Sequence, residues 1–239
     1  MKFKVKLLDR RDVAEGTKAI FFEKPPAFSF KAGQYCDFTL VDPPETDAEG
    51  NVRTFSLAGA PFEDRIMIAT RMRDSAFKRV LAAMPIGGEI QMEGPMGSMT
   101  LQNDASRPAV FLAGGIGITP FRSIIANAAH EKLPHEIWLF YSNRRPEDAA
   151  FLGELGDLEK QNPHFRLVGT MTGMENSKQK WNGETGYIDG EMLKRHLDDI
   201  AKPIYYVAGP PTMTMAMRVA LNGIGVDDDY IKSEEFAGY

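Results

Sequence analysis

The feature that most constrains the fold of this chain is a change in hydrophobic pattern near residue 105 of 239. Before that point, short segments with alternating polar and apolar residues are separated by turn residues, as is typical of antiparallel strands. After it, apolar runs alternate with segments of helical period, as is typical of parallel strands joined by helices. We therefore predict two domains: an N-terminal antiparallel β-barrel at residues 1–104 and a C-terminal α/β domain with a parallel sheet and flanking helices at residues 105–239.

The individual elements follow from the same two periodicities. For the barrel they predict a helix at 75–84 and strands at 2–8, 17–22, 35–40, 52–57 and 65–71. For the second domain they predict strands at 109–113, 137–141, 165–171, 204–208 and 230–233, with helices at 151–160, 191–197 and 213–221 and another starting near Pro120.

Composition excludes several classes of protein. Because Cys36 is the only cysteine, the chain can form neither an internal disulfide nor a four-thiolate iron-sulfur cluster, and we predict no metal site. A net charge of -5 argues against bulk attraction to nucleic acid. No apolar run is long enough for a membrane span, and the start of the sequence lacks the apolar block of a secretory leader. We expect a cytoplasmic protein.

The strongest local motif is the turn Ala113-Gly114-Gly115-Ile116-Gly117-Ile118-Thr119-Pro120, which lies between an apolar strand and an amphipathic helix. Glycines allow the backbone to approach a phosphate closely, and the free N–H groups at a helix N-terminus favour an anion. We expect Thr119 to cap the helix, with Pro120 at its first position. Pro120 stands where a Rossmann fingerprint has its third glycine, so the motif differs from that fingerprint, and a simple tight turn is the alternative interpretation.

A second turn of this kind follows the strand at 204–208, with the sequence Gly209-Pro210-Pro211-Thr212-Met213. Two such turns at the carboxyl ends of strands in one sheet face a common crevice, where open α/β sheets bind ligands. A plain helix start is the alternative for Pro210-Pro211.

A third motif, Arg53-Thr54-Phe55-Ser56, lies on an alternating strand of the predicted barrel. A flavin requires an aromatic contact for its ring, a guanidinium for its phosphates and a hydroxyl or N–H partner for its N5 atom. These residue types satisfy those needs, although four residues alone also fit an ordinary strand with one exposed arginine.

Taken in order, these motifs resemble the ferredoxin-NADP reductase superfamily. The resemblance spans nearly the whole chain, since Phe30-Lys31-Ala32-Gly33-Gln34-Tyr35 and Gly94-Pro95-Met96-Gly97 also match, as does an aromatic tail. It implies a barrel that binds FAD, a domain that binds NAD(P)H, and hydride transfer from nicotinamide C4 to flavin N5 where the domains meet. FAD rather than FMN is favoured only by its frequency in the family.

The resemblance also implies roles for barrel residues. Arg53 would hold the flavin pyrophosphate, Phe55 would stack on the isoalloxazine, and Ser56 would lie near N5, with Thr54 between them. Further flavin contacts are implied for the edge segment Ala69, Thr70 and Arg71, and for the helix start Ala76, Phe77 and Lys78. Relatives usually have a serine where this chain has Lys78, which puts that contact in doubt.

In the second domain, the resemblance implies pyridine-nucleotide contacts for two groups of residues, Gly114, Gly115, Gly117 and Thr119 in the first turn and Gly209, Pro210 and Met213 in the second. Ala208 replaces a cysteine that many relatives have beside the hydride path. In the tail, Phe236 is the first choice for the aromatic residue that covers the flavin, and Tyr239 is the second. Glu234 would then be a proton donor near the flavin, with a solvated carboxylate as the alternative.

The choice between NADH and NADPH is expected after the second strand of the α/β domain. Ser142, Arg144 and Arg145 could bind a 2′-phosphate, which slightly favours NADPH, but arginine also occurs here in relatives that use NADH.

The electron acceptor is expected to be a separate soluble redox protein, either ferredoxin-like or an oxygenase component. A candidate docking patch consists of Arg71, Arg73, Lys78 and Arg79, and scattered surface charge is the alternative. Two other functions stay open: a reductase that uses free flavin as a substrate, and a non-catalytic relay or regulatory subunit.

Overall fold

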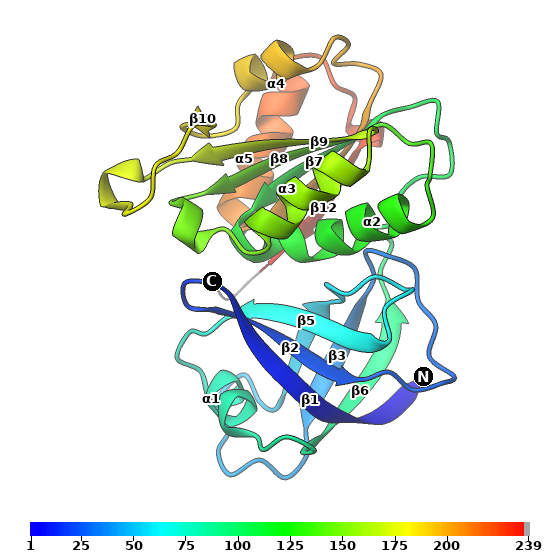
Figure 1. Ribbon diagram of the computed structural model, residues 1–239, viewed down its shortest axis with the longest axis vertical. Helices are drawn as coiled ribbons and strands as arrows, with labels where there is room; N and C mark the ends of the chain where they lie inside the picture. Colours follow the sequence, from blue (N-terminus) through cyan, green and yellow to red (C-terminus); the bar gives the residue numbers. More distant parts are fainter. Residues whose placement is uncertain (237–239) are drawn as a thin grey trace.

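A computed structural model describes residues 1–236 and places two sheets one above the other (Figure 1). The N-terminal sheet is antiparallel, with six strands in the order β4-β3-β6-β1-β2-β5. Its two outer strands, β4 and β5, contact each other, so the sheet curls into a barrel. Its elements are β1 (Lys2–Ala14), β2 (Thr17–Glu23), β3 (Tyr35–Leu40), β4 (Val52–Ser56), β5 (Arg65–Arg71), β6 (Glu89–Met96) and the helix α1 (Ala76–Ala83).

Strand alternation builds the barrel core. In β3, Cys36, Phe38 and Leu40 are buried while the residues between them are partly exposed, which is the period-two pattern of a strand with one face inward. The helix α1 contributes Phe77 and Leu81 to the same core. Ser75 caps α1, because its side chain accepts a hydrogen bond from the backbone N–H of Lys78.

The C-terminal sheet is parallel, with six strands in the order β10-β9-β8-β7-β11-β12. The strands are β7 (Ala109–Gly114), β8 (Ile137–Asn143), β9 (Phe165–Met171), β10 (Glu184–Thr185), β11 (Ile204–Gly209) and β12 (Ile231–Glu235). The helices α2 (Ile118–His130) and α3 (Leu152–Gln161) lie on the face nearer the barrel, while α4 (Gly190–His196) and α5 (Pro211–Gly223) lie on the opposite face (Figure 1). Every residue of β7 is buried, as expected for a central strand covered on both faces.

The strand order reverses between β7 and β11. From β7 the chain runs outward through β8 and β9, then returns to place β11 on the other side of β7. The connections that leave β7 and β11 therefore run to opposite faces of the sheet and open a crevice between them. Both glycine turns lie at this point, since they follow the carboxyl ends of β7 and β11.

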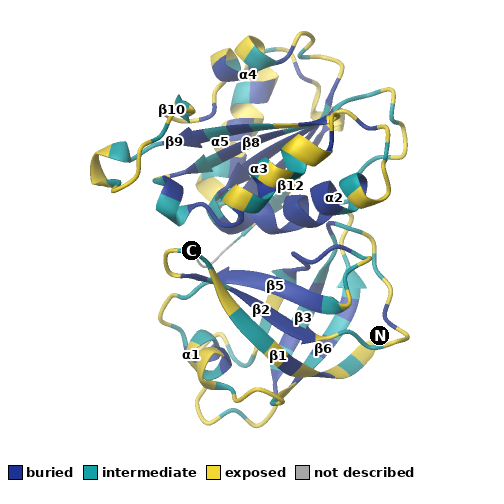
Figure 2. Ribbon diagram, in the orientation of Figure 1, coloured by how far each residue is buried: buried dark blue, intermediate teal, exposed yellow. Residues whose placement is uncertain are grey.

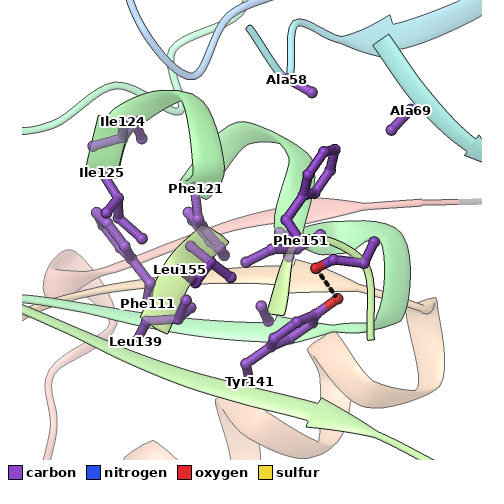
Figure 3. Packing of buried hydrophobic residues seen from close by; sticks show 14 of the residues in the cluster. Ala58, Ala69, Phe111, Phe121, Ile124, Ile125, Leu139, Tyr141, Phe151 and Leu155 are labelled. Carbon is purple, nitrogen blue, oxygen red and sulfur yellow. Dashed lines mark hydrogen bonds between the residues drawn. The ribbon is translucent and has the colours of Figure 1, made fainter. Parts of the chain in front are cut away.

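The two domains share a hydrophobic cluster (Figure 3). Ala58 and Ala69 of the barrel pack in the same cluster as Phe111, Phe121 and Tyr141 of the second domain. Phe111 and Phe121 stack with ring centroids 4.6 Å apart. Most residues of β2, β5, β7, β8 and β11 are buried, whereas β1 has exposed residues along its length, as do the helices and loops (Figure 2). The domains are thus packed against each other through apolar side chains.

The predicted fold class is confirmed, with differences in detail. β6 and β10 were not predicted. β6 contains Gly94 and Pro95, which are typical of turns, and β10 has only two residues, too few to show a strand pattern. β1 continues to Ala14 through a polar stretch that pairs with β2. The predicted boundary near residue 104 falls in the connection between β6 and β7.

The predicted capping role of Thr119 is wrong. A short 3₁₀ turn at Gly115–Gly117 leads directly into α2, which begins at Ile118. Thr119 therefore lies inside the helix, and its hydroxyl donates to the carbonyl of Ile116, 3.1 Å away. Pro120 is tolerated because it is still in the first turn, where its missing N–H has no intrahelical acceptor.

Candidate functional site

A cavity of about 290 Å³ lies between the domains, and we call it the interdomain cavity. It brings together the Arg53 strand, the glycine turn and the tail, because Ser56, Thr119 and Phe236 all line it. Its full lining comprises Glu49, Arg53, Thr54, Phe55, Ser56, Ala69, Thr70, Arg71, Arg73, Asp74, Ser75, Lys78, Ile116, Thr119 and Phe236.

Ser56 is the most informative residue in this cavity. Its side chain is buried, with 4% exposed, and its Oγ has no hydrogen-bond partner among the described residues. A buried hydroxyl without a partner is costly, so a site that keeps one is suited to a ligand that supplies the missing bond. Phe55 lies beside it at the edge of the barrel core, with its ring 5.9 Å from that of Phe77.

The lining of the interdomain cavity carries more positive than negative charge. Arg53, Arg71, Arg73 and Lys78 line it, against Glu49 and Asp74. Burial, together with the positive charges of Arg73 and Arg53, lowers the pKa of Lys78 below its ordinary value. Such a concentration of positive charge favours an anionic ligand.

The guanidinium of Arg53 already has anionic partners. Its Nη2 lies 3.1 Å from Oδ1 of Asp47 and 2.9 Å from Oε2 of Glu49. Its Nη1 donates to the backbone carbonyls of Glu49, Gly50 and Val52 at 2.8 to 3.0 Å. Arg53 is thus held by the loop that precedes its own strand.

A larger cavity of about 770 Å³ opens at the carboxyl edge of the parallel sheet, and we call it the sheet-edge cavity. Both glycine turns line it, through Gly114 and Gly115 on one side and Pro210 and Met213 on the other. A Cβ on Gly114 would lie 2.2 Å from the Met213 sulfur, so the Met213 side chain would have to move to admit any other residue where the turns meet. Gly115 adopts φ +54, the left-handed conformation that favours glycine.

The two cavities are adjacent, because Arg71 and Arg73 line both. Nη2 of Arg71 lies 3.3 Å from the position that a Cβ on Gly115 would occupy. This arginine at the end of β5 therefore stands at the junction between the barrel and the first glycine turn.

The residues predicted to determine the choice between NADH and NADPH do not all line the same cavity. Ser142 and Arg144 line the sheet-edge cavity, whereas Arg145 does not. Arg145 instead forms a two-point ion pair with Asp148, at 2.7 and 2.9 Å, and a second ion pair with Glu15 at 3.0 Å. Only one of the two arginines is therefore available to a ligand in that cavity.

Sequence patterns missed several lining residues. Thr172 and Tyr187 line the sheet-edge cavity, and the Tyr187 side chain is highly exposed, at 79%. Both lie in irregular segments without a motif. The only local signal in the sequence was the position of Tyr187 directly after a glycine. Thr212, Ala216, Met217 and Ala220 line the cavity from α5.

Besides Arg145, four predicted contact residues lie outside the linings of both cavities: Ala76, Phe77, Gly117 and Gly209. Phe77 is in the barrel core. The backbone N–H of Ala76 donates to Oδ2 of Asp47 at 3.0 Å. Gly117 has a packing role, because a Cβ there would lie 2.2 Å from the carbonyl oxygen of Ala208.

The tail returns to the interdomain cavity. The N–H of Phe236 donates to the carbonyl of Gly209 at 3.0 Å, and Phe236 also packs against the cluster shared by the domains. Glu234 pairs with Ala208 across β11 and β12 but lines neither cavity, and burial raises its pKa to about 7. Tyr239, the second choice for the aromatic cover, lies outside the described residues.

The predicted docking patch is divided by the structure. Arg71, Arg73 and Lys78 line the interdomain cavity, while Arg79 forms ion pairs with Glu45 and Asp74 on the outer side of α1. The four side chains therefore do not form one open basic surface.

Comparisons with known proteins agree with this architecture. Residues 111–218 match the model of the oxidoreductase NAD-binding domain. The chain is 26% identical over 210 residues to the reductase component 1 of terephthalate 1,2-dioxygenase from Comamonas, covering 87% of this chain and 60% of that protein. A ferredoxin NADP+ reductase from Neisseria gonorrhoeae, solved with bound FAD and NADP, superposes with a TM-score of 0.80 at 20% identity and 98% coverage of both chains. The Amycolatopsis cytochrome P450 reductase superposes with a TM-score of 0.83 at 21% identity, covering 99% of this chain and 70% of that one.

The chain therefore has the two-domain fold of that ferredoxin NADP+ reductase, and residues 111–218 are similar to the oxidoreductase NAD-binding domain. It spans about 60% of the length of curated relatives such as the oxygenase reductase components. Within residues 1–236, no helix combines the length and apolar character that crossing a membrane requires.

Proposed function

We propose that this chain is a flavoprotein reductase that takes hydride from NAD(P)H onto a bound flavin and passes electrons to a separate redox protein. One observation carries the proposal. The Arg53-to-Ser56 strand, the glycine turn and Phe236 line one cavity, and that cavity adjoins the crevice between the two turns of the parallel sheet.

The residues present fit a flavin. Ser56 offers a buried hydroxyl without a protein partner among the described residues, Phe55 offers an aromatic face, and the cationic lining suits phosphate groups. A bound flavin supplies the ability to accept a hydride and release electrons one at a time. The first turn offers backbone N–H groups for the pyrophosphate of the nicotinamide nucleotide, whereas Pro210 and Pro211 of the second turn have none.

Each residue has a separate task in this proposal. Ser56 would donate its hydroxyl hydrogen to the flavin, Phe236 would cover the ring, and Arg71 would neutralise phosphate charge where the cavities join. Packing between the domains keeps water from the reacting faces, which strengthens these polar contacts. Glu234 lines neither cavity, so its proposed role as proton donor would require a movement of the tail.

The acceptor is proposed from the relatives. Several of them are named as reductase components of oxygenase systems, which pair a reductase with a separate protein. We propose an oxygenase component or a ferredoxin-like protein as the acceptor.

The proposal is tested by adding FAD to the purified protein and mixing the complex anaerobically with NADH or NADPH. We expect loss of the oxidised flavin absorbance with at least one of the two nucleotides. Bound flavin that neither nucleotide bleaches would show a relay or regulatory subunit instead. Failure to bind any flavin would reject the proposal.

Arg144 provides a test of nucleotide choice. We predict that Arg144→Gln raises the Kd for NADPH roughly tenfold and leaves the Kd for NADH nearly unchanged, because one charge-assisted phosphate contact is lost. Arg145→Gln is the matched control, since Arg145 is held by Asp148 and Glu15 and should not affect either nucleotide. Titration calorimetry measures both constants. An equal loss for both nucleotides in Arg144→Gln would remove the preference for NADPH.

A further inference from the structure

The loop at residues 42–51, between β3 and β4, is attached to arginines of β4 and α1 by three acidic side chains, and we call it the acidic loop. Asp47 and Glu49 bind Arg53, and Glu45 binds Arg79. The attachments join the loop to β4 and to α1, two elements of the proposed flavin site.

Asp47 makes contacts that resemble those of a bound phosphate. One of its oxygens faces the guanidinium of Arg53 at 3.1 Å, and the other accepts the backbone N–H of Ala76 at 3.0 Å, at the start of α1. A guanidinium and a helix N-terminus together form a typical anion site. In this protein the chain supplies the anion itself.

The carboxylate of Asp47 is ionised across the working pH range. Loss of hydration opposes ionisation, but hydrogen bonds from Arg53 and from the Ala76 N–H outweigh it and hold the pKa of Asp47 below its ordinary value. Glu49 adds a second negative charge 2.9 Å from the same guanidinium and itself lines the interdomain cavity. A flavin phosphate approaching Arg53 therefore meets two carboxylates, the partly buried one of Asp47 and the exposed one of Glu49.

The ring-binding part of the cavity is not blocked in this way. Ser56 lines the cavity next to Phe55 and is only 4% exposed. Its hydroxyl has no hydrogen-bond partner among the described residues. The same site thus offers contacts to a flavin ring while its strand arginine is occupied by the chain.

We propose that Asp47 and Glu49 act as an internal anion that competes with flavin phosphates for Arg53, so that the phosphates add less to flavin binding than a free Arg53 would allow. This inference rests on the proposed flavin function and deepens it. It assigns the acidic loop the task of setting how strongly the phosphates of FAD and FMN contribute to binding.

The decisive measurement is the ratio of the Kd for riboflavin to the Kd for FMN or FAD, obtained from quenching of flavin fluorescence. Riboflavin lacks phosphate, so the ratio isolates the phosphate contribution. We expect Asp47→Asn with Glu49→Gln to raise this ratio roughly tenfold or more, because Arg53 becomes free to form a charge-assisted contact. Both replacements keep the size of the side chain, and the amide introduced by Asp47→Asn retains an oxygen that can accept the Ala76 N–H.

Two controls define the origin of the effect. Glu45→Gln removes a carboxylate from the same loop, but this carboxylate binds Arg79 and not Arg53. The ratio of the riboflavin Kd to the FMN or FAD Kd should therefore stay as in the unmodified protein. Adding Arg53→Met to the double variant should abolish the gain. Circular dichroism and thermal melting establish that each variant is folded.

The outcomes separate the two proposals. A ratio that is unchanged or lower in the folded double variant overturns the role of the acidic loop while leaving the flavin function intact. A gain that persists without Arg53 also overturns it. If no flavin binds to any of the folded proteins, the flavin function itself fails.

Discussion

At the residue scale, the polar side chains of the interdomain cavity differ in whether the fold supplies them with partners. Ser56 has none among the described residues, whereas Arg53 is saturated by carboxylates and carbonyls of its own loop. A ligand can bond the Ser56 hydroxyl without displacing a protein partner, whereas a ligand that binds Arg53 competes with its carboxylates. Two residues of a single motif therefore differ in how readily they bind a ligand.

Glu234 gives a residue-scale prediction. Burial raises its pKa from 4.5 to about 7, so the native state holds this proton more tightly than the unfolded chain. The resulting stabilisation is present below pH 4.5 and is lost as the pH rises through about 7. We expect Glu234→Gln to match the unmodified protein in melting temperature at low pH and to exceed it at about pH 8. Melting curves across this range measure the difference, and a difference independent of pH would contradict the assignment.

At the element scale, the first glycine turn combines backbone conformation with close packing. Gly115 needs a left-handed φ beside Arg71, and Gly117 must pass against the carbonyl of Ala208. The turn therefore joins β7 to α2 in a shape that places Gly114 and Gly115 in the lining of the sheet-edge cavity.

The turn gives an element-scale prediction. Gly115→Ala places a side chain in a left-handed conformation that costs about 1 to 2 kcal/mol, and its Cβ would lie 3.3 Å from the Arg71 guanidinium. We expect the Kd for the nicotinamide nucleotide to rise roughly fivefold or more. Gly16→Ala is the matched control, because Gly16 has φ +65 with open space around it, in the turn between β1 and β2. It should lose similar stability without affecting nucleotide binding, as calorimetric titration would measure.

At the scale of the whole molecule, a buried ion network fastens the domains together. Arg122 of α2 donates to the carbonyl of Ala58 at 3.0 Å and pairs with Glu63 of the barrel at 2.7 Å, and it also pairs with Glu154 of α3. Ser123 adds a hydrogen bond to the carbonyl of Gly59 at 2.6 Å. These contacts hold the domains on the side of α2, beside the shared apolar cluster.

Arg122 gives the corresponding prediction. We expect Arg122→Met to lower the free energy of unfolding by about 3 kcal/mol, because it leaves two partly buried carboxylates without their partner. Arg218→Met is the control, since Arg218 pairs with Asp228 at an exposed site and should cost less than about 1 kcal/mol. Urea unfolding followed by circular dichroism measures both. Equal losses in the two variants would show that the network does not stabilise the domain interface.

Periodicity and residues with special backbone requirements predicted the two-domain fold, most of the strands and both glycine turns, because such signals act over a few positions. The resemblance to a known family implied the roles of Ser56 and Phe236. Which arginines are available to ligands depends on contacts formed in the folded protein. Arg145 is bound by Glu15, which lies 130 positions away in the sequence. Asp47, which holds Arg53, also accepts a hydrogen bond from Ala76, 29 positions after Asp47. Such partners are brought together by the packing of distant segments, and a local pattern does not specify them.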